Sequence, residues 1–271
     1  RHFKMLLAMI TLLWLAAPIC AAEVRGRVFL DANKNGQADP GEQGIAGVLV
    51  SDGLTVVATA DNGSYQFPLA ESPAIVRMTR PEGHTPSGSF WQKTGGAAPV
   101  DFGLVEQKQP NDFYFVHVTD SHLGRLDLFK EFAARINRFP LPLAFTINTG
   151  DLVGGVDTAS IEAAKTQFDN YLEGAAEFQG TLLNLPGNHE HVAMHLKDAD
   201  QNHPRYGKGL YRELLGPVYH SWDYAHVHFI ALDGTTLPYQ ERLGERQLAW
   251  LKNDLALTPK ERPIVLFCHQ S

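Results

Sequence analysis

Four short polar clusters are the residues of this sequence best suited to chemistry. They are Asp120-Ser121-His122, Gly150-Asp151, Gly187-Asn188-His189-Glu190 and the single His269. Carboxylate and amide oxygens and imidazole nitrogens are donors that divalent ions such as Zn²⁺, Mn²⁺ or iron accept in proteins. The sequence therefore predicts a metal centre with mixed oxygen and nitrogen ligands, provided that the fold brings the clusters together.

Each cluster follows an apolar run that reads as a β-strand. The predicted strands that end at the clusters are 112–118, 143–149, 180–186 and 263–269. Helices are predicted over 125–139, 160–178 and 247–255, and two further strands, 218–224 and 226–232, are predicted to pair. Alternating strands and helices indicate an α/β fold with a largely parallel sheet. Ligands bind such folds outside the C-terminal ends of the strands, so we expect the clusters to share one edge.

The order of the clusters resembles the calcineurin-like metallophosphoesterase family. The family pattern runs D-x-H, G-D, G-N-H-[ED], a lone His and finally G-H-x-H. Its first four parts stand here as DSH (120–122), GD (150–151), GNHE (187–190) and CHQ (268–270). The resemblance extends over residues 112–271 and implies a layered α+β sandwich. The final G-H-x-H is expected beyond Ser271, so we predict a catalytic domain over 107–271 that is incomplete at its C-terminus.

The resemblance implies a dinuclear centre that holds two divalent transition-metal ions, Mn, Zn or Fe. It assigns Asp120 and His122 to the first metal, Asp151 to both metals, and Asn188 and His269 to the second. The expected reaction is hydrolysis of a phosphate mono- or diester by a hydroxide that the two ions generate.

Three histidines in or near the third cluster are not expected to bind metal. The resemblance assigns His189 to catalysis, as the group that donates a proton to the leaving group, and not to a metal. His191 and His195 follow closely, and we expect them either at the mouth of the pocket or in solvent.

A second candidate metal site lies near the start of the chain. Residues 31–42, DANKNGQADPGE, fit the calcium-loop pattern D-x-[DN]-x-[DN]-G-x₅-E. The loop and the following G-I-x-G-V pattern resemble the B-type domains of serine-aspartate-repeat adhesins. A solvated turn without an ion is the alternative. The oxygen donors, which suit Ca²⁺, fall on Asp31, Asn33, Asn35, Asp39 and Glu42.

Residues 23–106 are predicted to form a small all-β sandwich in front of the catalytic domain. Short apolar runs over 24–30, 46–51, 54–60, 64–69 and 74–80 alternate with turn residues. Residues 82–99 are rich in Gly, Pro and Ser and are predicted to be a loop. The polar segment 106–111 is predicted to link the two domains.

The N-terminus is predicted to be a secretory signal peptide over residues 1–22. Arg1 and Lys4 precede the apolar run 5–19, and small residues follow it. The run is short for a membrane span and contains Pro18. We therefore expect an exported protein, periplasmic or secreted, with no membrane span in the mature chain.

The charge of the chain limits its partners. The formal net charge is −7, and loss of Arg1 and Lys4 with the signal peptide would bring it to −9. We therefore expect no general binding to nucleic acid. Two functions stay open: a phosphoesterase acting on a phosphorylated small molecule or an envelope polymer, and a surface-binding or adhesion protein with a degenerate phosphoesterase scaffold. The intact clusters favour the phosphoesterase.

Overall fold

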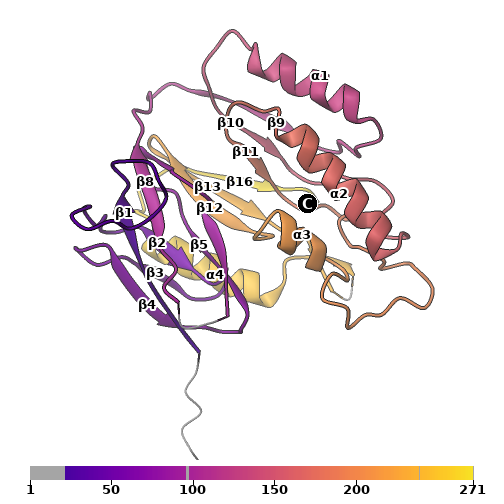
Figure 1. Ribbon diagram of the computed structural model, residues 1–271, viewed down its shortest axis with the longest axis horizontal. Coiled ribbons are helices and arrows are strands. Elements are labelled where there is room, and N and C mark those ends of the chain that lie inside the picture. Colours follow the sequence, from indigo (N-terminus) through magenta and orange to yellow (C-terminus); the bar gives the residue numbers. More distant parts are fainter. Residues whose placement is uncertain (1–21, 96–97, 238, 271) are drawn as a thin grey trace, which may run out of the picture.

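Within the described residues, two four-stranded sheets make up the front region, residues 23–106, of the computed structural model (Figure 1). The structure describes residues 22–95, 98–237 and 239–270. The predicted signal peptide lies outside them except for its last residue, so export stays a prediction. The sheet orders are β4-β1-β8-β6 and β3-β2-β5-β7. The strands are β1 (Glu23–Leu30), β2 (Leu49–Ser51), β3 (Val56–Ala58), β4 (Ser64–Pro68), β5 (Ala74–Met78), β6 (His84–Pro86), β7 (Trp91–Thr94) and β8 (Phe102–Glu106).

Alternating side chains build one core between these two sheets. In β4, Tyr65 and Phe67 are buried, whereas Ser64 and Gln66 are exposed. This is the pattern of a strand with one face against a core. The front region is therefore β-rich, as predicted. Its core combines residues from both sheets: Val24, Val28, Val48, Val50, Tyr65, Phe67, Val76, Met78, Val100, Phe102 and Leu104.

The prediction that residues 82–99 form a loop is wrong in part. It contains β6 and β7, which are edge strands of the two sheets. β6 pairs with β8 and includes Pro86, and a proline, which has no N–H, is tolerated on an edge strand. The turn-rich composition carries no period-two pattern, which is why the sequence does not predict these strands.

The second region, residues 107–270, has two three-stranded sheets among its described residues instead of one largely parallel sheet. The sheet β11-β10-β9 is parallel, whereas β12-β13-β16 is mixed. Phe145 of β10 packs edge-on against Trp222 of β12, with ring centroids 5.3 Å apart, so the two sheets share a core. A short pair, β14 with β15, lies beyond β13. The strands are β9 (Tyr114–Val118), β10 (Leu143–Asn148), β11 (Leu182–Asn184), β12 (His220–Tyr224), β13 (Val227–Leu232), β14 (Thr235–Thr236), β15 (Gln240–Glu241) and β16 (Ile264–Cys268).

Four helices accompany these sheets in the described part of the chain. They are α1 (Leu126–Asn137), α2 (Ile161–Ala175), α3 (Gly209–Leu214) and α4 (Glu245–Leu257). Phe129 of α1 contacts Tyr171 of α2, and both helices lie beside the β9–β11 sheet in Figure 1. The sequence predicts α1, α2 and α4 but not the short α3. None of the described helices has the length and apolar character that crossing a membrane requires.

Hydrogen bonds connect the front region to the second region. The Gln109 side chain, in the predicted linker, accepts hydrogen bonds from the backbone N–H of Gly83 at 2.9 Å and of Ala225 at 2.8 Å. The hydroxyls of Thr79 and Ser221 lie 2.9 Å apart. The linker therefore holds a fixed position between the two regions.

A buried ion-pair network ties α4 to the mixed sheet. His228 of β13 lies between two carboxylates, with Nδ1 2.7 Å from Asp223 and Nε2 2.8 Å from Asp254 of α4. Burial alone would lower the pKa of His228, but the hydrogen bonds and charges of the two carboxylates outweigh it and raise the pKa from 6.5 to about 9. The imidazole is therefore protonated at neutral pH and donates both hydrogen bonds.

This network predicts a loss of stability in alkali. Because the folded-state pKa of His228 is raised, its stabilisation is complete below pH 6.5 and is lost as the pH rises to about 9. The loss from this group amounts to about 3 kcal/mol. Urea unfolding between pH 6.5 and 9.5 should show this decrease, and His228→Gln should remove most of it. The exposed His226→Gln should keep the wild-type slope, and an equal slope in the two variants would contradict the assignment.

Candidate metal centre

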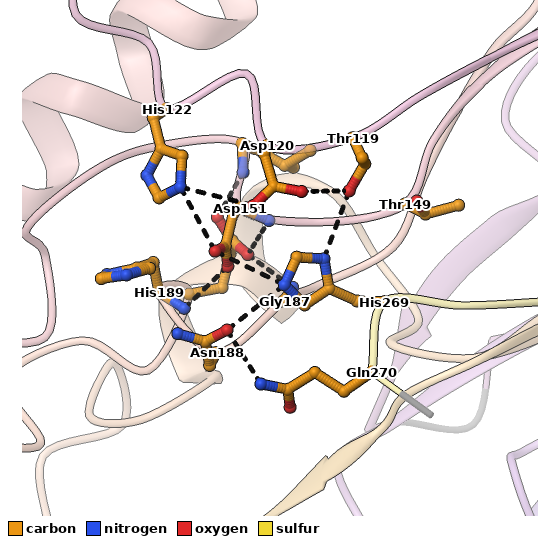
Figure 2. Close-up of polar contacts among 12 residues, drawn as sticks. Thr119, Asp120, His122, Thr149, Asp151, Gly187, Asn188, His189, His269 and Gln270 are labelled. Atoms are coloured by element: carbon orange, nitrogen blue, oxygen red, sulfur yellow. Dashed lines mark hydrogen bonds and ion pairs between the residues drawn. The ribbon is translucent and has the colours of Figure 1, made fainter.

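Four strand ends meet at the candidate metal centre (Figure 2). Asp120 follows β9, Asp151 follows β10 and Asn188 comes after β11, so three strands of the parallel sheet deliver a candidate ligand at the same edge. His122 lies in the loop after Asp120. His269 follows β16 and therefore reaches the site from the mixed sheet.

Asp151 lies at the middle of the cluster. Its Oδ2 is 3.3 Å from Nε2 of His122 and 3.4 Å from Nε2 of His269. Figure 2 shows the two imidazoles on opposite sides of the carboxylate. Two tetrahedral ligands of one ion, each about 2.1 Å from it, lie about 3.4 Å apart. The distances around Asp151 therefore fit an ion on each side of its carboxylate.

The other two predicted ligands lie against this core. Asp120 Oδ1 is 3.7 Å from Nε2 of His122. Asn188 Oδ1 is 3.2 Å from Nε2 of His269. The structure thus brings all five predicted ligands together.

Two overlapping groups of side chains have their donor atoms close enough for one ion each. His122, Asp151 and His189 form the first group, and Asp120, Asp151 and His269 form the second, with the donor atoms of each group within 4.8 Å of one another. Asp151 belongs to both groups. This grouping pairs Asp120 with His269, whereas the resemblance pairs it with His122. It also places a nitrogen of His189 within reach of the first group.

The loops that carry these ligands need unusual backbone conformations. Asp120, His122 and Asp151 have positive φ angles of 56°, 35° and 51°. Such residues are uncommon outside glycine and concentrate at functional sites. Gly187 is required for a different reason, because a Cβ there would lie 2.2 Å from Oδ1 of Asp151. The G-D and G-N-H motifs therefore include a glycine because the two loops touch.

Glu190 is the buried acceptor that holds the two loops together. Its Oε1 accepts hydrogen bonds from the backbone N–H of Leu152 at 2.7 Å and of Val153 at 3.2 Å. Its Oε2 accepts from Asp151 N at 3.0 Å and Gly187 N at 2.6 Å. Burial raises the pKa of Glu190 to about 7, even though the four N–H donors, which favour the carboxylate, act to lower it. Glu190 therefore positions ligands without belonging to either potential ligand group.

The electrostatics of the cluster keep its central carboxylate charged. Burial alone would raise the pKa of Asp151, but the His269 hydrogen bond, the His189 N–H and the charges of these imidazoles lower it below its usual range. The same pairing with Asp151 raises the pKa of His269. A deprotonated carboxylate is the form that binds a metal ion.

His191 is not at the mouth of the pocket, which corrects one expectation. It is fully buried, with Nε2 2.8 Å from the Thr235 hydroxyl. Burial lowers its pKa to about 3, so the ring is neutral. The same hydroxyl also contacts the ammonium of Lys208, so His191 belongs to a buried polar network. His195 is exposed, the other expected position, and its backbone N–H donates to Asp157.

Three polar neighbours of the centre were not predicted from the sequence. The Thr119 hydroxyl donates to Asp120 at 2.7 Å, and the Gln270 amide donates to Asn188 at 3.0 Å. Thr119 and Gln270 each stand next to a predicted ligand in the chain, and this adjacency could have indicated them from the sequence. Asp157 lies 3.6 Å from Nδ1 of His189 and belongs to a loop with no motif.

The predicted calcium loop folds back on itself through its own oxygen donors. Asp31 accepts from the backbone N–H of Asn35 and Gly36, and Glu42 accepts from Ala32 and Asp39. The amides of Asn33 and Asn35 both donate to Oδ2 of Asp39, at 2.7 and 2.8 Å. All five predicted oxygen-bearing side chains therefore lie in one closed loop.

Comparison with known proteins supports the phosphoesterase class. Residues 32–115 match a family described as the N terminal of calcineurin-like phosphoesterase. The matched segment covers most of the front region and the start of β9, so it supports the class independently of the ligand residues. No curated protein matches the chain. The resemblance of the front region to adhesin domains stays a prediction.

Proposed function

We propose that this protein is a metallophosphoesterase that hydrolyses a phosphate mono- or diester with two divalent ions. The observation that carries this proposal is Asp151, a buried carboxylate common to both potential ligand groups. The match of residues 32–115 supports the same class. The substrate would be a phosphorylated small molecule or an envelope polymer outside the cytoplasm, as the predicted signal peptide implies.

The candidate ligands have distinct roles in this proposal. Asp120 and His122 would hold one ion, Asn188 and His269 the other, and Asp151 both. When bound, the two ions would clamp the phosphoryl oxygens and lower the pKa of a water. The donor set fits, because it combines imidazole nitrogens with carboxylate and amide oxygens.

His189 would transfer the proton to the leaving group. Its Nδ1 lies 3.6 Å from the Asp157 carboxylate, whose charge would orient the protonated ring and leave Nε2 for the substrate. About one third of its side chain is exposed, so a substrate can reach it. An imidazole suits proton transfer near neutral pH.

An assay with two model substrates tests the proposal. The full-length protein would be stripped of metal, reloaded with Mn²⁺ or Zn²⁺, and given bis-p-nitrophenyl phosphate and p-nitrophenyl phosphate. We expect metal-dependent release of nitrophenol from at least one of them. No release from either substrate, with two metal ions per chain confirmed by elemental analysis, would favour the adhesion function instead.

We also propose that the front-region loop binds Ca²⁺. Rotation of the Asn33 and Asn35 amides would turn their oxygens toward the Asp39 carboxylate, which now accepts from their nitrogens. With Asp31 and Glu42, this set has the oxygen character that Ca²⁺ prefers. The ion would stiffen the front region.

Calcium should therefore raise the melting temperature of the front region. At a calcium concentration about 100 times Kd, the stabilisation should be about 2.7 kcal/mol. Calorimetry in calcium and in EGTA measures it, with Asp31→Asn as the loss variant. Asp61→Asn, in another exposed turn of the same region, is the matched control. A calcium shift that is absent from the wild type, or that persists unchanged in Asp31→Asn, would refute this site.

A further inference from the structure

A cavity of about 330 Å³ lies where the front region meets the second region, away from the predicted ligands. We call it the junction cavity. One wall comes from the β6–β7 segment, residues 85–91, and the other from β11, β12 and the end of α3. The backbones of Arg80 and Trp222 form a parallel bridge between the two regions at this place. Its volume is at the lower end of the range for small-molecule sites.

Three buried polar side chains that line the junction cavity have nitrogen atoms without a hydrogen-bond partner. Arg80 leaves Nε and Nη2 unpaired, His220 leaves both ring nitrogens unpaired, and Trp222 leaves its indole N–H unpaired. Their exposed fractions are 6%, 3% and 2%. A buried polar group without a partner costs about 1–3 kcal/mol. Three such groups on one cavity are the arrangement expected of a site whose ligand supplies the missing acceptors.

The charged side chains around the junction cavity favour an anionic ligand. No carboxylate occurs among the described residues that line it. The backbone N–H of Asp223 donates to the Arg80 carbonyl at 2.8 Å, but the two carboxylate oxygens of Asp223 already pair with His228 and Arg262, each at 2.7 Å. Burial lowers the pKa of Arg80 to about 10, so its guanidinium stays charged at neutral pH. The Arg80 guanidinium lies 6.0 Å from the centroid of the Tyr224 ring but has no carboxylate of its own, so it attracts a negative group locally in spite of the net negative charge of the chain.

The remaining walls select a ligand with an apolar body. Phe90 packs against His220 in a tilted arrangement, with ring centroids 5.1 Å apart, and Trp91, Leu215 and Pro217 extend the apolar surface. Burial lowers the pKa of His220 to about 3. The imidazole is therefore neutral, and it adds one donor and one acceptor but no charge.

We propose that the junction cavity binds a small organic anion, whose carboxylate or phosphate head pairs with Arg80 and the Trp222 indole N–H and whose apolar body packs against Phe90 and Trp91. Arg80 presents a planar guanidinium, which suits either head group. Because both regions contribute walls, the bound anion also holds them together. This site is separate from the metal centre, and the proposal does not depend on phosphoesterase activity.

Titration of simple aromatic anions tests the proposal. The full-length protein, kept in EDTA so that no metal binds the probe, would be titrated with 3-phenylpropionate and with phenylphosphonate. Tryptophan fluorescence and calorimetry report binding, because Trp91 and Trp222 line the cavity. We expect at least one of the two probes to bind with a Kd below about 1 mM. The neutral 3-phenylpropionamide should bind at least about tenfold more weakly, since it lacks the charge. The two anions together distinguish a carboxylate site from a phosphate site.

Two arginine variants provide the decisive comparison. Arg80→Met should weaken the better probe at least about tenfold. Arg77→Met is the matched control, because Arg77 is also a buried arginine with an unpaired nitrogen but does not line this cavity. It should keep the Kd within about twofold. Trp222→Phe, which keeps the ring and removes the N–H, should weaken binding and serves if Arg80→Met does not fold. A Kd above about 1 mM for both anions, equal binding of the amide, or equal losses in the two arginine variants would overturn the proposal.

Discussion

Replacement of Asp151 by asparagine is expected to abolish metal-dependent hydrolysis. The carboxylate of Asp151 is within 3.4 Å of the imidazoles on both sides, and an amide offers one neutral oxygen in its place. Neither ion would then keep its shared anionic ligand. We expect kcat/KM on the better nitrophenyl substrate to fall at least about 10³-fold and the bound metal to fall below two ions per chain.

Two control variants separate this effect from a general loss of function. Asp169→Asn removes an exposed carboxylate of α2 that pairs with Lys165, and it should leave activity and metal content unchanged. His189→Gln should lower the rate while both ions stay bound, because His189 is proposed to transfer a proton and not to hold metal. An Asp151→Asn protein with two bound ions and the wild-type rate would contradict the proposed shared ligand.

Replacement of Glu190 by glutamine is expected to be the most destabilising isosteric change at the site. One oxygen of the side chain becomes an NH₂ group, so two of the four backbone N–H donors lose their acceptor. The free energy of unfolding should fall by about 2–5 kcal/mol. Metal affinity should fall about 10–100-fold, because the loops of Asp151 and Asn188 lose their common anchor.

Urea unfolding measures the first effect, and metal titration well below the melting temperature measures the second. Glu173→Gln is the matched control, because Glu173 is an exposed glutamate of α2 that pairs with Lys130. It should change stability and metal affinity by little. A Glu190→Gln protein that is less stable but binds metal as tightly as the wild type would show that Glu190 only supports the fold. Unchanged stability would contradict the hydrogen bonds themselves.

The positions of the predicted ligands followed from a simple geometric rule. Polar residues after successive parallel strands meet at one sheet edge, and Asp120, Asp151 and Asn188 do so after β9, β10 and β11. The rule does not explain the position of His269, because this residue follows β16, which belongs to a second sheet. An apolar strand pattern specifies a buried strand but not the sheet to which it pairs, so strand periodicity alone could not predict this arrangement.

Other features of the site depend on contacts between residues distant in the chain. Glu190 stands in a recognisable motif, but its role is set by N–H groups of a loop 37 to 39 residues earlier. His191 has the same sequence neighbourhood but lies inside the fold, where its Nε2 is 2.8 Å from the Thr235 hydroxyl. Edge strands such as β6 carry a proline and no alternation, so local composition indicates a loop where pairing with β8 makes a strand.

The junction cavity illustrates the same limit for function. Neither Arg80 nor His220 belongs to a motif, and they are 140 positions apart in the chain. Their common feature is that both line one cavity and carry buried nitrogen atoms without hydrogen-bond partners. Such a site becomes visible only when the two regions are packed together.

Anomalous X-ray diffraction at the manganese edge, from crystals of the full-length protein grown with Mn²⁺, tests the central claim most directly. Two anomalous peaks about 3.5–4 Å apart are expected. Each should lie within about 2.3 Å of an oxygen of Asp151, with His122 at one peak and His269 at the other. A single peak, or two peaks that Asp151 does not contact, would contradict a dinuclear centre built on this carboxylate.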